Sequence, residues 1–119
     1  MGERPVHWVG TAKKDLLAMP GEVVDDFGYA LGLLQLGGFP PSAKPWKGEG
    51  PGVLELVEEH RGGAYQAVVL VRFRQAIYVL HCFQKKATRG IRTAARDVAI
   101  VGERFRAARE DYEARHGTS

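Results

Sequence analysis

The sequence lacks the features that mark several large classes of protein. It has a single cysteine, Cys82, so no internal disulfide can form, which suits the reducing cytoplasm. No apolar run approaches the roughly 20 residues that a membrane-spanning helix requires, and the run from Ala67 to Val71 has the length of a buried strand. Glu3 and Arg4 are not followed by the apolar stretch of a secretory signal peptide. We therefore expect a cytoplasmic protein that has no contact with a membrane.

The composition that remains is that of an ordinary globular domain with an uneven charge. Hydrophobic residues make up 45% of the 119 residues and charged residues 26%, which predicts a single domain spanning 1–119. Residues 1–60 carry 5 basic and 9 acidic side chains, whereas residues 61–109 carry 11 basic and 2 acidic ones. The net charge of +3 therefore hides a strongly cationic second half. Such asymmetry points to an anionic partner, although a solvated charged surface would also explain it.

The spacing of apolar residues predicts an α+β fold. The predicted strands are 6–9, 53–58, 65–73 and 76–83, and the predicted helices are 12–19, 20–36 and 94–114, the last capped by Thr93. Residues 60–63 (HRGG) are expected to form a hairpin turn, and residues 39–52 are too rich in Pro and Gly for regular structure. An N-terminal helical pair and a C-terminal helix are therefore expected to pack on a small sheet.

The last predicted strand runs directly into a cluster of cations. Strand alternation places His81 on one face with Val79 and Phe83, and Cys82 on the other face. Four basic side chains follow within a short stretch, namely Lys85, Lys86, Arg89 and Arg92. Cationic side chains on a rigid support are what a phosphate backbone requires, so we expect RNA or DNA to lie against this end of the sheet.

Three residues each have two interpretations. His81 is the only histidine on a core strand near the cations, so it is either a proton-transfer group or a buried, hydrogen-bonded strand residue. Trp46 lies between Lys44 and Lys47, so it either stacks on a base while the lysines hold phosphates or pins its loop to the core. Cys82 is expected to be a small core residue rather than a nucleophile, because no cysteine-hydrolase signature surrounds it.

Three segments resemble the RelE/HigB superfamily of bacterial toxin ribonucleases, and in particular the phage-derived HigB-like branch of type II toxin–antitoxin systems. They are PPSAKPWKG at 40–48, VLELVEEHRGGAY at 53–65 and YVLHCFQKKATRGI at 78–91. The resemblance implies a RelE-like fold with a small, mainly antiparallel sheet. It also implies a cytoplasmic protein that cleaves mRNA, usually at the translating ribosome, and needs no cofactor. The implied protein partner is a helix-turn-helix antitoxin that neutralises the toxin.

The candidate site residues follow from the chemistry of metal-free RNA cleavage. The reaction needs a base for the 2′-hydroxyl, an acid for the leaving oxygen and cations for the developing phosphate charge. No cluster of carboxylates or histidines has the spacing of a metal site, so a metal-free route is expected. The catalytic candidates are His81, Lys85 and Lys86. The candidates for RNA and phosphate binding are Lys44, Lys47, Arg61, Arg72, Arg89 and Arg92.

Two positions depart from the pattern of the family. The family usually has Tyr-Arg on the central strand and a further Tyr shortly after it, where this chain has Gln66 and Val69. That Arg is the implied phosphate-stabilising residue, and Gln has neither its charge nor its bidentate geometry. Losing such a group commonly lowers the rate roughly 10²- to 10³-fold. The chain is therefore either an active endoribonuclease or a catalytically weakened module that binds antitoxin, RNA or the ribosome without cleavage. A generic DNA-binding domain, the third hypothesis, would need a recognition helix that the sequence does not show.

Overall fold

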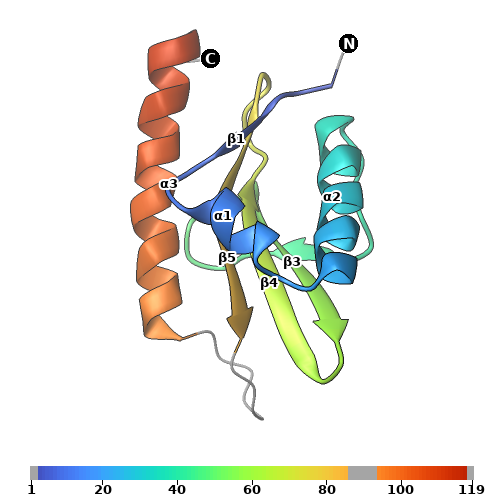
Figure 1. Cartoon of the computed structure of the whole chain (residues 1–119). Coiled ribbons are helices and arrows are strands. Elements are labelled where there is room, and N and C mark those ends of the chain that lie inside the picture. Colours follow the sequence, from blue (N-terminus) through green and yellow to red (C-terminus); the bar gives the residue numbers. More distant parts are fainter. Residues whose placement is uncertain (1–2, 86–93, 118–119) are drawn as a thin grey trace.

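Residues 3–85 and 94–117 are described by the computed structural model, which arranges their strands in one mixed sheet (Figure 1). The strand order is β1-β5-β4-β3-β2, in which β1 runs parallel to β5 and the other neighbouring pairs are antiparallel. The strands are β1 (Val6–Trp8), β2 (Ala43–Pro45), β3 (Val53–His60), β4 (Gly63–Leu70) and β5 (Ile77–Lys85). The helices are α1 (Ala12–Leu17), α2 (Gly21–Gln35) and α3 (Ala95–His116). The predicted α+β fold, with a helical pair and a C-terminal helix on a mainly antiparallel sheet, is confirmed.

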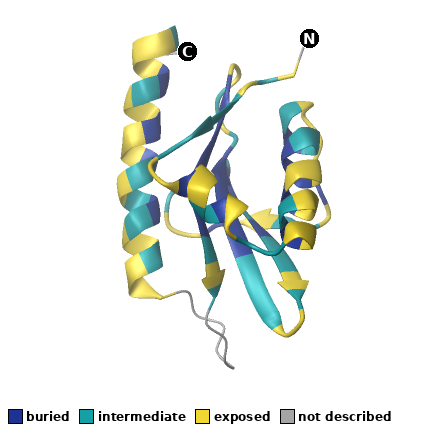
Figure 2. Ribbon diagram, viewed as in Figure 1, coloured by how far each residue is buried: buried dark blue, intermediate teal, exposed yellow. Residues whose placement is uncertain are grey.

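The sheet lies between two layers of helix, and the buried sides of both layers face it (Figure 2). Phe27 and Leu34 of α2 are seven residues apart and therefore lie on one side of the helix, where they pack with Val79. Phe105 and Tyr112 of α3 have the same spacing and pack on the opposite face of the sheet. α3 lies along β5, close to one edge of the sheet. On this face of the sheet, α3 therefore does not lie along the β2–β3 edge.

A short strand interrupts the segment 39–52, so the prediction that this segment has no regular structure is wrong for three residues. β2 pairs antiparallel with β3, and Lys44 lies opposite Glu55. Pro45 has no N–H to donate, but β2 is an edge strand and needs no hydrogen-bond partner on its outer side. The density of Pro and Gly excludes an interior strand and still permits a short edge strand.

The predicted hairpin turn joins β3 to β4 through two residues. His60 pairs with Gly63, and Arg61 and Gly62 between them have φ angles of +50° and +82°. Both central residues are thus left-handed, as the tight turns that match strand twist require. Glycine adopts this conformation without strain. Arg61 is the single non-glycine residue with positive φ among those described.

A β-bulge changes the face on which His81 lies. Val69 pairs with Val79 and Val68 pairs with His81, so Leu80 has no residue opposite it. Two residues of β5 here match one residue of β4, and the alternation of side chains shifts by one position. The prediction that His81 shares a face with Val79 is therefore wrong, because Val79 belongs to the core under α1 and α2 whereas His81 contacts α3.

The bulge is supported by Arg104 of α3. Its guanidinium donates a hydrogen bond to the Leu80 carbonyl at 3.0 Å, so the residue displaced from the ladder keeps a partner for its oxygen. Gly10 makes room for this guanidinium, since a Cβ at that position would lie 2.9 Å from it. Gly10 also has a φ of +58°, which a residue with a side chain rarely adopts.

Candidate functional site

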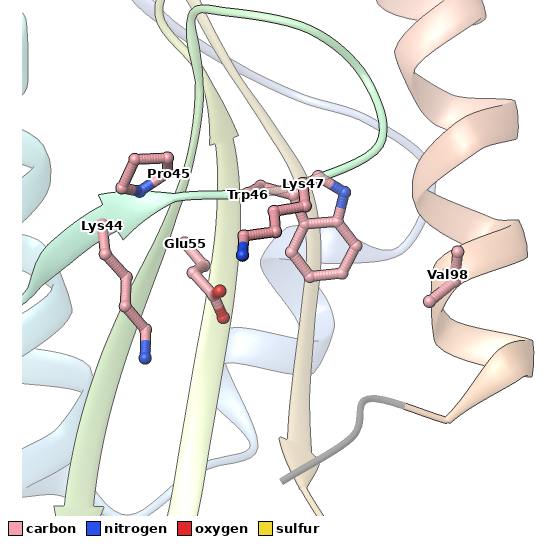
Figure 3. Close-up of a pocket in the computed structure, with 6 residues that line it drawn as sticks. All are labelled: Lys44, Pro45, Trp46, Lys47, Glu55 and Val98. Carbon is pink, nitrogen blue, oxygen red and sulfur yellow. The ribbon is translucent and has the colours of Figure 1, made fainter.

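A groove of about 500 Å³ opens between the β2–β3 edge of the sheet and the start of α3 (Figure 3). The residues that line it are Lys44, Pro45, Trp46, Lys47, Glu55 and Val98. Lys44 and Lys47 are exposed and Glu55 is half-buried, so the groove carries two cations around one carboxylate. Figure 3 shows Val98 of α3 facing Trp46 across this hollow. The groove thus brings together Lys44, Trp46 and Lys47, and their role in binding RNA stays a prediction.

Trp46 forms part of the floor of the groove. Its side chain is only 6% exposed and belongs to the core on the α3 face of the sheet. Its backbone N–H donates to the Val53 carbonyl at 2.9 Å, which extends the pairing of β2 with β3. Of the two predicted roles, this burial matches the one in which Trp46 pins its segment to the core.

Glu55 is held by Gln66, which stands where the resemblance implies an arginine. Gln66 is 2% exposed on β4, and its Nε2 donates a hydrogen bond to Glu55 Oε1. Val57 lies opposite Gln66 in the sheet, so Glu55 is the diagonal neighbour on the same face. Sequence reasoning missed Glu55, although a charged residue between the apolar Val53 and Val57 was a usable signal.

His81 is held in the same way by Asp97 of α3. Its Nε2 lies 2.8 Å from Asp97 Oδ1, and its ring stacks on Phe83 with the ring centroids 4.7 Å apart. His81 is 6% exposed and hydrogen-bonded, as the structural interpretation requires, and its part in proton transfer stays a prediction. The contact joins β5 to the first turn of α3. Asp97 could not be found from the sequence, because its contact with His81 depends on how α3 packs.

Four polar residues thus form a row across the sheet, from Glu55 through Gln66 and His81 to Asp97. Gln66 lies opposite Phe83, two residues from His81, and both side chains are on the α3 face. Within the described part of the chain, Gln66 Oε1 and His81 Nδ1 are buried and have no hydrogen-bond partner. A buried polar atom without a partner commonly costs about 1–3 kcal/mol, and both of these atoms belong to the row.

Of the predicted cations outside the groove, Lys85 and Arg61 lie at one end of the sheet. Lys85 ends β5, half-buried and opposite Ala64, and Arg61 is exposed at the tip of the β3–β4 hairpin. The structure thus places Arg61 at the end of the sheet where β5 also ends. The other three cations of the predicted cluster, Lys86, Arg89 and Arg92, lie outside the described residues, as does the predicted helix cap Thr93.

Arg72 and Val69 lie away from the groove lining. The Arg72 guanidinium donates to the Pro51 carbonyl at 2.8 and 3.0 Å and to the Glu49 carbonyl at 3.1 Å, and it lies over the Phe105 ring. These bonds fix the loop after Trp46. Val69 is fully buried in the core under α1 and α2, on the face of the sheet opposite Gln66.

Cys82 behaves as the core residue that the sequence predicted. It is 2% exposed in the core under α1 and α2, and burial raises the pKa of its thiol to about 12. Such a thiol is protonated near neutral pH, and the thiol is a far weaker nucleophile than the thiolate.

Two further findings concern the described residues as a whole. Across residues 3–85 and 94–117, no three His, Cys, Asp or Glu side chains come together as a metal ion would require. None of the helices in these ranges combines the length and the apolar character that crossing a bilayer demands.

Comparison with known proteins identifies a family. Neither the curated proteins nor the solved structures contain a match to this chain. A family model, described as phage derived protein Gp49-like (DUF891), matches residues 14–106. The matched segment includes β2, β3, β4 and β5 together with the first half of α3, and therefore every residue that lines the groove. The chain belongs to the Gp49-like family of phage-derived proteins.

Proposed function

We propose that this chain is the toxin of a toxin–antitoxin system and that it cleaves mRNA, at the ribosome, in the groove between β2, β3 and α3. The observation that carries the proposal is the pair Lys44 and Lys47 around Glu55 in an open groove. Cations supply phosphate binding there, and a carboxylate supplies a base. Membership of the Gp49-like family and the resemblance to the HigB-like branch support the same activity.

The proposed chemistry is the attack of a 2′-hydroxyl on the adjacent phosphorus. Glu55 takes the proton of the hydroxyl, the new O–P bond forms, and the bond to the 5′ oxygen breaks. The leaving oxygen gains a proton, so the products end in a 2′,3′-cyclic phosphate and a 5′-hydroxyl. Lys44 and Lys47 stabilise the charge that develops on the phosphate oxygens.

The other predicted catalytic residues have proposed roles at the end of β5. His81 is held by Asp97 through Nε2, so its Nδ1 is the nitrogen proposed to supply the proton to the leaving oxygen. Lys85 and Lys86 are proposed to hold the RNA backbone beyond the scissile phosphate. Arg61, Arg89 and Arg92 would add phosphate contacts, with ribosomal RNA or mRNA as the partner.

A second candidate function is a module that keeps the fold and binds antitoxin or RNA without cleavage. The specific observation in its favour is Gln66. This side chain is neutral and buried, and it donates to the carboxylate proposed as the base. A guanidinium at the same place would supply two parallel donors and a positive charge to the phosphate.

Regulated expression in a bacterial host, alone and with the adjacent gene, tests the proposed function. The expected result is growth arrest with new 5′-hydroxyl mRNA ends inside reading frames, relieved by the neighbouring gene product. Glu55→Gln is the matched control, because a glutamine oxygen still accepts the hydrogen bond from Gln66 while the base is lost. Normal growth with intact mRNA, from protein shown to be soluble, would refute cleavage and support the binding module.

A further inference from the structure

The outer side of α2 exposes a stripe of large apolar side chains. Tyr29 and Leu36 are each 72% exposed, and Phe39, just beyond the helix, is 64% exposed. Tyr29 lies on α2 and Leu36 is its C-cap seven positions later, so both are on the side away from the buried Phe27 and Leu34. Figure 2 shows α2 with an exposed outer side along its length. Exposed apolar residues that cluster in this way commonly mark an interaction surface.

The same surface is acidic. α2 contains Glu22, Asp25 and Asp26 and has no Lys or Arg. Beside it lies a hollow of about 300 Å³ lined by Asp26, Tyr29, Ala30, Pro40, Pro41, Ser42 and Glu58. Burial, together with the charge of Asp26, raises the pKa of Glu58, so the two carboxylates repel each other across this hollow. None of the described residues that line it is basic. A cation from a partner would relieve the repulsion.

We infer that the α2 surface, formed by Asp26, Tyr29, Leu36, Phe39 and Glu58, binds a basic amphipathic segment of the antitoxin. Apolar side chains of that segment cover Tyr29, Leu36 and Phe39, and a Lys or Arg enters the hollow between Asp26 and Glu58. An RNA ligand is disfavoured here, because the carboxylates repel phosphates. The identity of the occupant rests on the proposed function, whereas the chemistry of the surface does not.

The position of this surface has a consequence for neutralisation. α2 packs on the face of the sheet opposite α3, whereas the groove lies on the α3 face. A segment docked on α2 therefore leaves Lys44, Lys47 and Glu55 uncovered. The antitoxin then neutralises by adding bulk that keeps the domain out of a confined site such as the ribosome, rather than by filling the groove.

Calorimetric titration of the purified chain with the purified product of the adjacent gene tests the inference. Tyr29→Ser and Leu36→Ser are each expected to weaken binding by at least about tenfold, as central contacts of an interface do. Asp26→Lys is expected to weaken binding similarly and at the same time to raise the melting temperature, because the lysine pairs with Glu58. Leu17→Ser, which removes an exposed apolar side chain of α1 outside this surface, is the matched control and should bind as the wild type does.

The outcomes separate the docking surface from the proposed function. Unchanged binding by the folded Tyr29→Ser and Asp26→Lys variants would overturn the docking surface and leave the toxin–antitoxin pair intact. Failure of the wild-type chain to bind the gene product would overturn both the pair and this occupant. Self-association of the wild-type chain that Tyr29→Ser abolishes would assign the surface to a second copy and overturn the inference. Weakened binding by the α2 variants together with normal binding by Leu17→Ser supports it.

Discussion

Replacing Gln66 by arginine is expected to raise the rate of RNA cleavage. Gln66 lies in the row of polar residues on the α3 face and donates to Glu55, which lines the groove. Arginine is longer than glutamine and carries a planar cation, so it can pair with the Glu55 carboxylate and extend toward a phosphate held by Lys44 and Lys47. The change introduces the arginine that the resemblance to the RelE/HigB superfamily implies at this position.

The expected gain is roughly 10²- to 10³-fold, by comparison with other groups that stabilise transition-state charge. A hundredfold gain corresponds to about 2.7 kcal/mol of transition-state stabilisation. The substitution is expected to lower the free energy of unfolding. Gln66 is 2% exposed, and a larger side chain in a packed site commonly destabilises a fold by about 1–3 kcal/mol. The pairing with Glu55 offsets part of the burial of the charge. Since domains are commonly stable by about 5–15 kcal/mol, the variant should remain folded.

The assay is cleavage of an end-labelled RNA by purified wild type and variants, with melting temperatures measured in parallel. Gln66→Met is the matched control, because methionine is similar in size to glutamine but has no charge and no donor. It is expected to cleave no faster than the wild type. A folded Gln66→Arg variant that also cleaves no faster would refute the assignment of this position to the phosphate.

Three further predictions concern the groove and the core. Lys44→Ala should make the dependence of log K on log salt for single-stranded RNA shallower by about 0.7, the amount expected for one lost phosphate contact, as fluorescence titrations at several salt concentrations will show. Tyr78→Phe removes a 2.7 Å hydrogen bond to Asp111, whose side chain is 40% exposed, so the loss should be near 1 kcal/mol. That hydrogen bond lowers the pKa of Asp111, so the carboxylate stabilises the fold above the usual aspartate pKa and this stability disappears as the pH falls through the lowered value. The difference in melting temperature between wild type and Tyr78→Phe should therefore shrink below about pH 4, and a constant difference would contradict it. Burial raises the pKa of Cys82 to about 12, so a thiol reagent at about pH 8 should modify the unfolded but not the native chain.

The sequence predicted the order of all elements except β2, because the formation of each depends on local patterns. Apolar residues at helical spacing predicted α2 and α3, and the HRGG segment predicted the turn at Arg61 and Gly62, since a tight hairpin needs positive φ there. β2 was missed because Pro45 argues against a strand, and only the sheet shows that this strand is at an edge. Local rules do not indicate which strand has a free side.

The candidate site was harder to predict because its contacts join separate elements. Glu55 meets Gln66 through strand register, and Asp97 meets His81 through the packing of α3 on β5. Neither register nor packing follows from the spacing of residues along one strand. The sequence does indicate that Gln66 and Val69 lie on opposite faces of the sheet, because they are an odd number of residues apart on one strand. The structure confirms that separation, and Val69 lies in the core under α1 and α2.

The bulge at Leu80 ties the polar row to the stability of the fold. Arg104 and Asp97 are seven residues apart on α3 and therefore share one side of the helix. Arg104 holds the carbonyl of the bulged residue, and Asp97 holds the histidine that follows it. Leu80 is fully buried, so the extra residue fills the core while His81 still reaches the polar row. The same two contacts that dock α3 on β5 thus set the direction of His81. A change at either contact is therefore expected to alter both the packing of α3 and the position of His81.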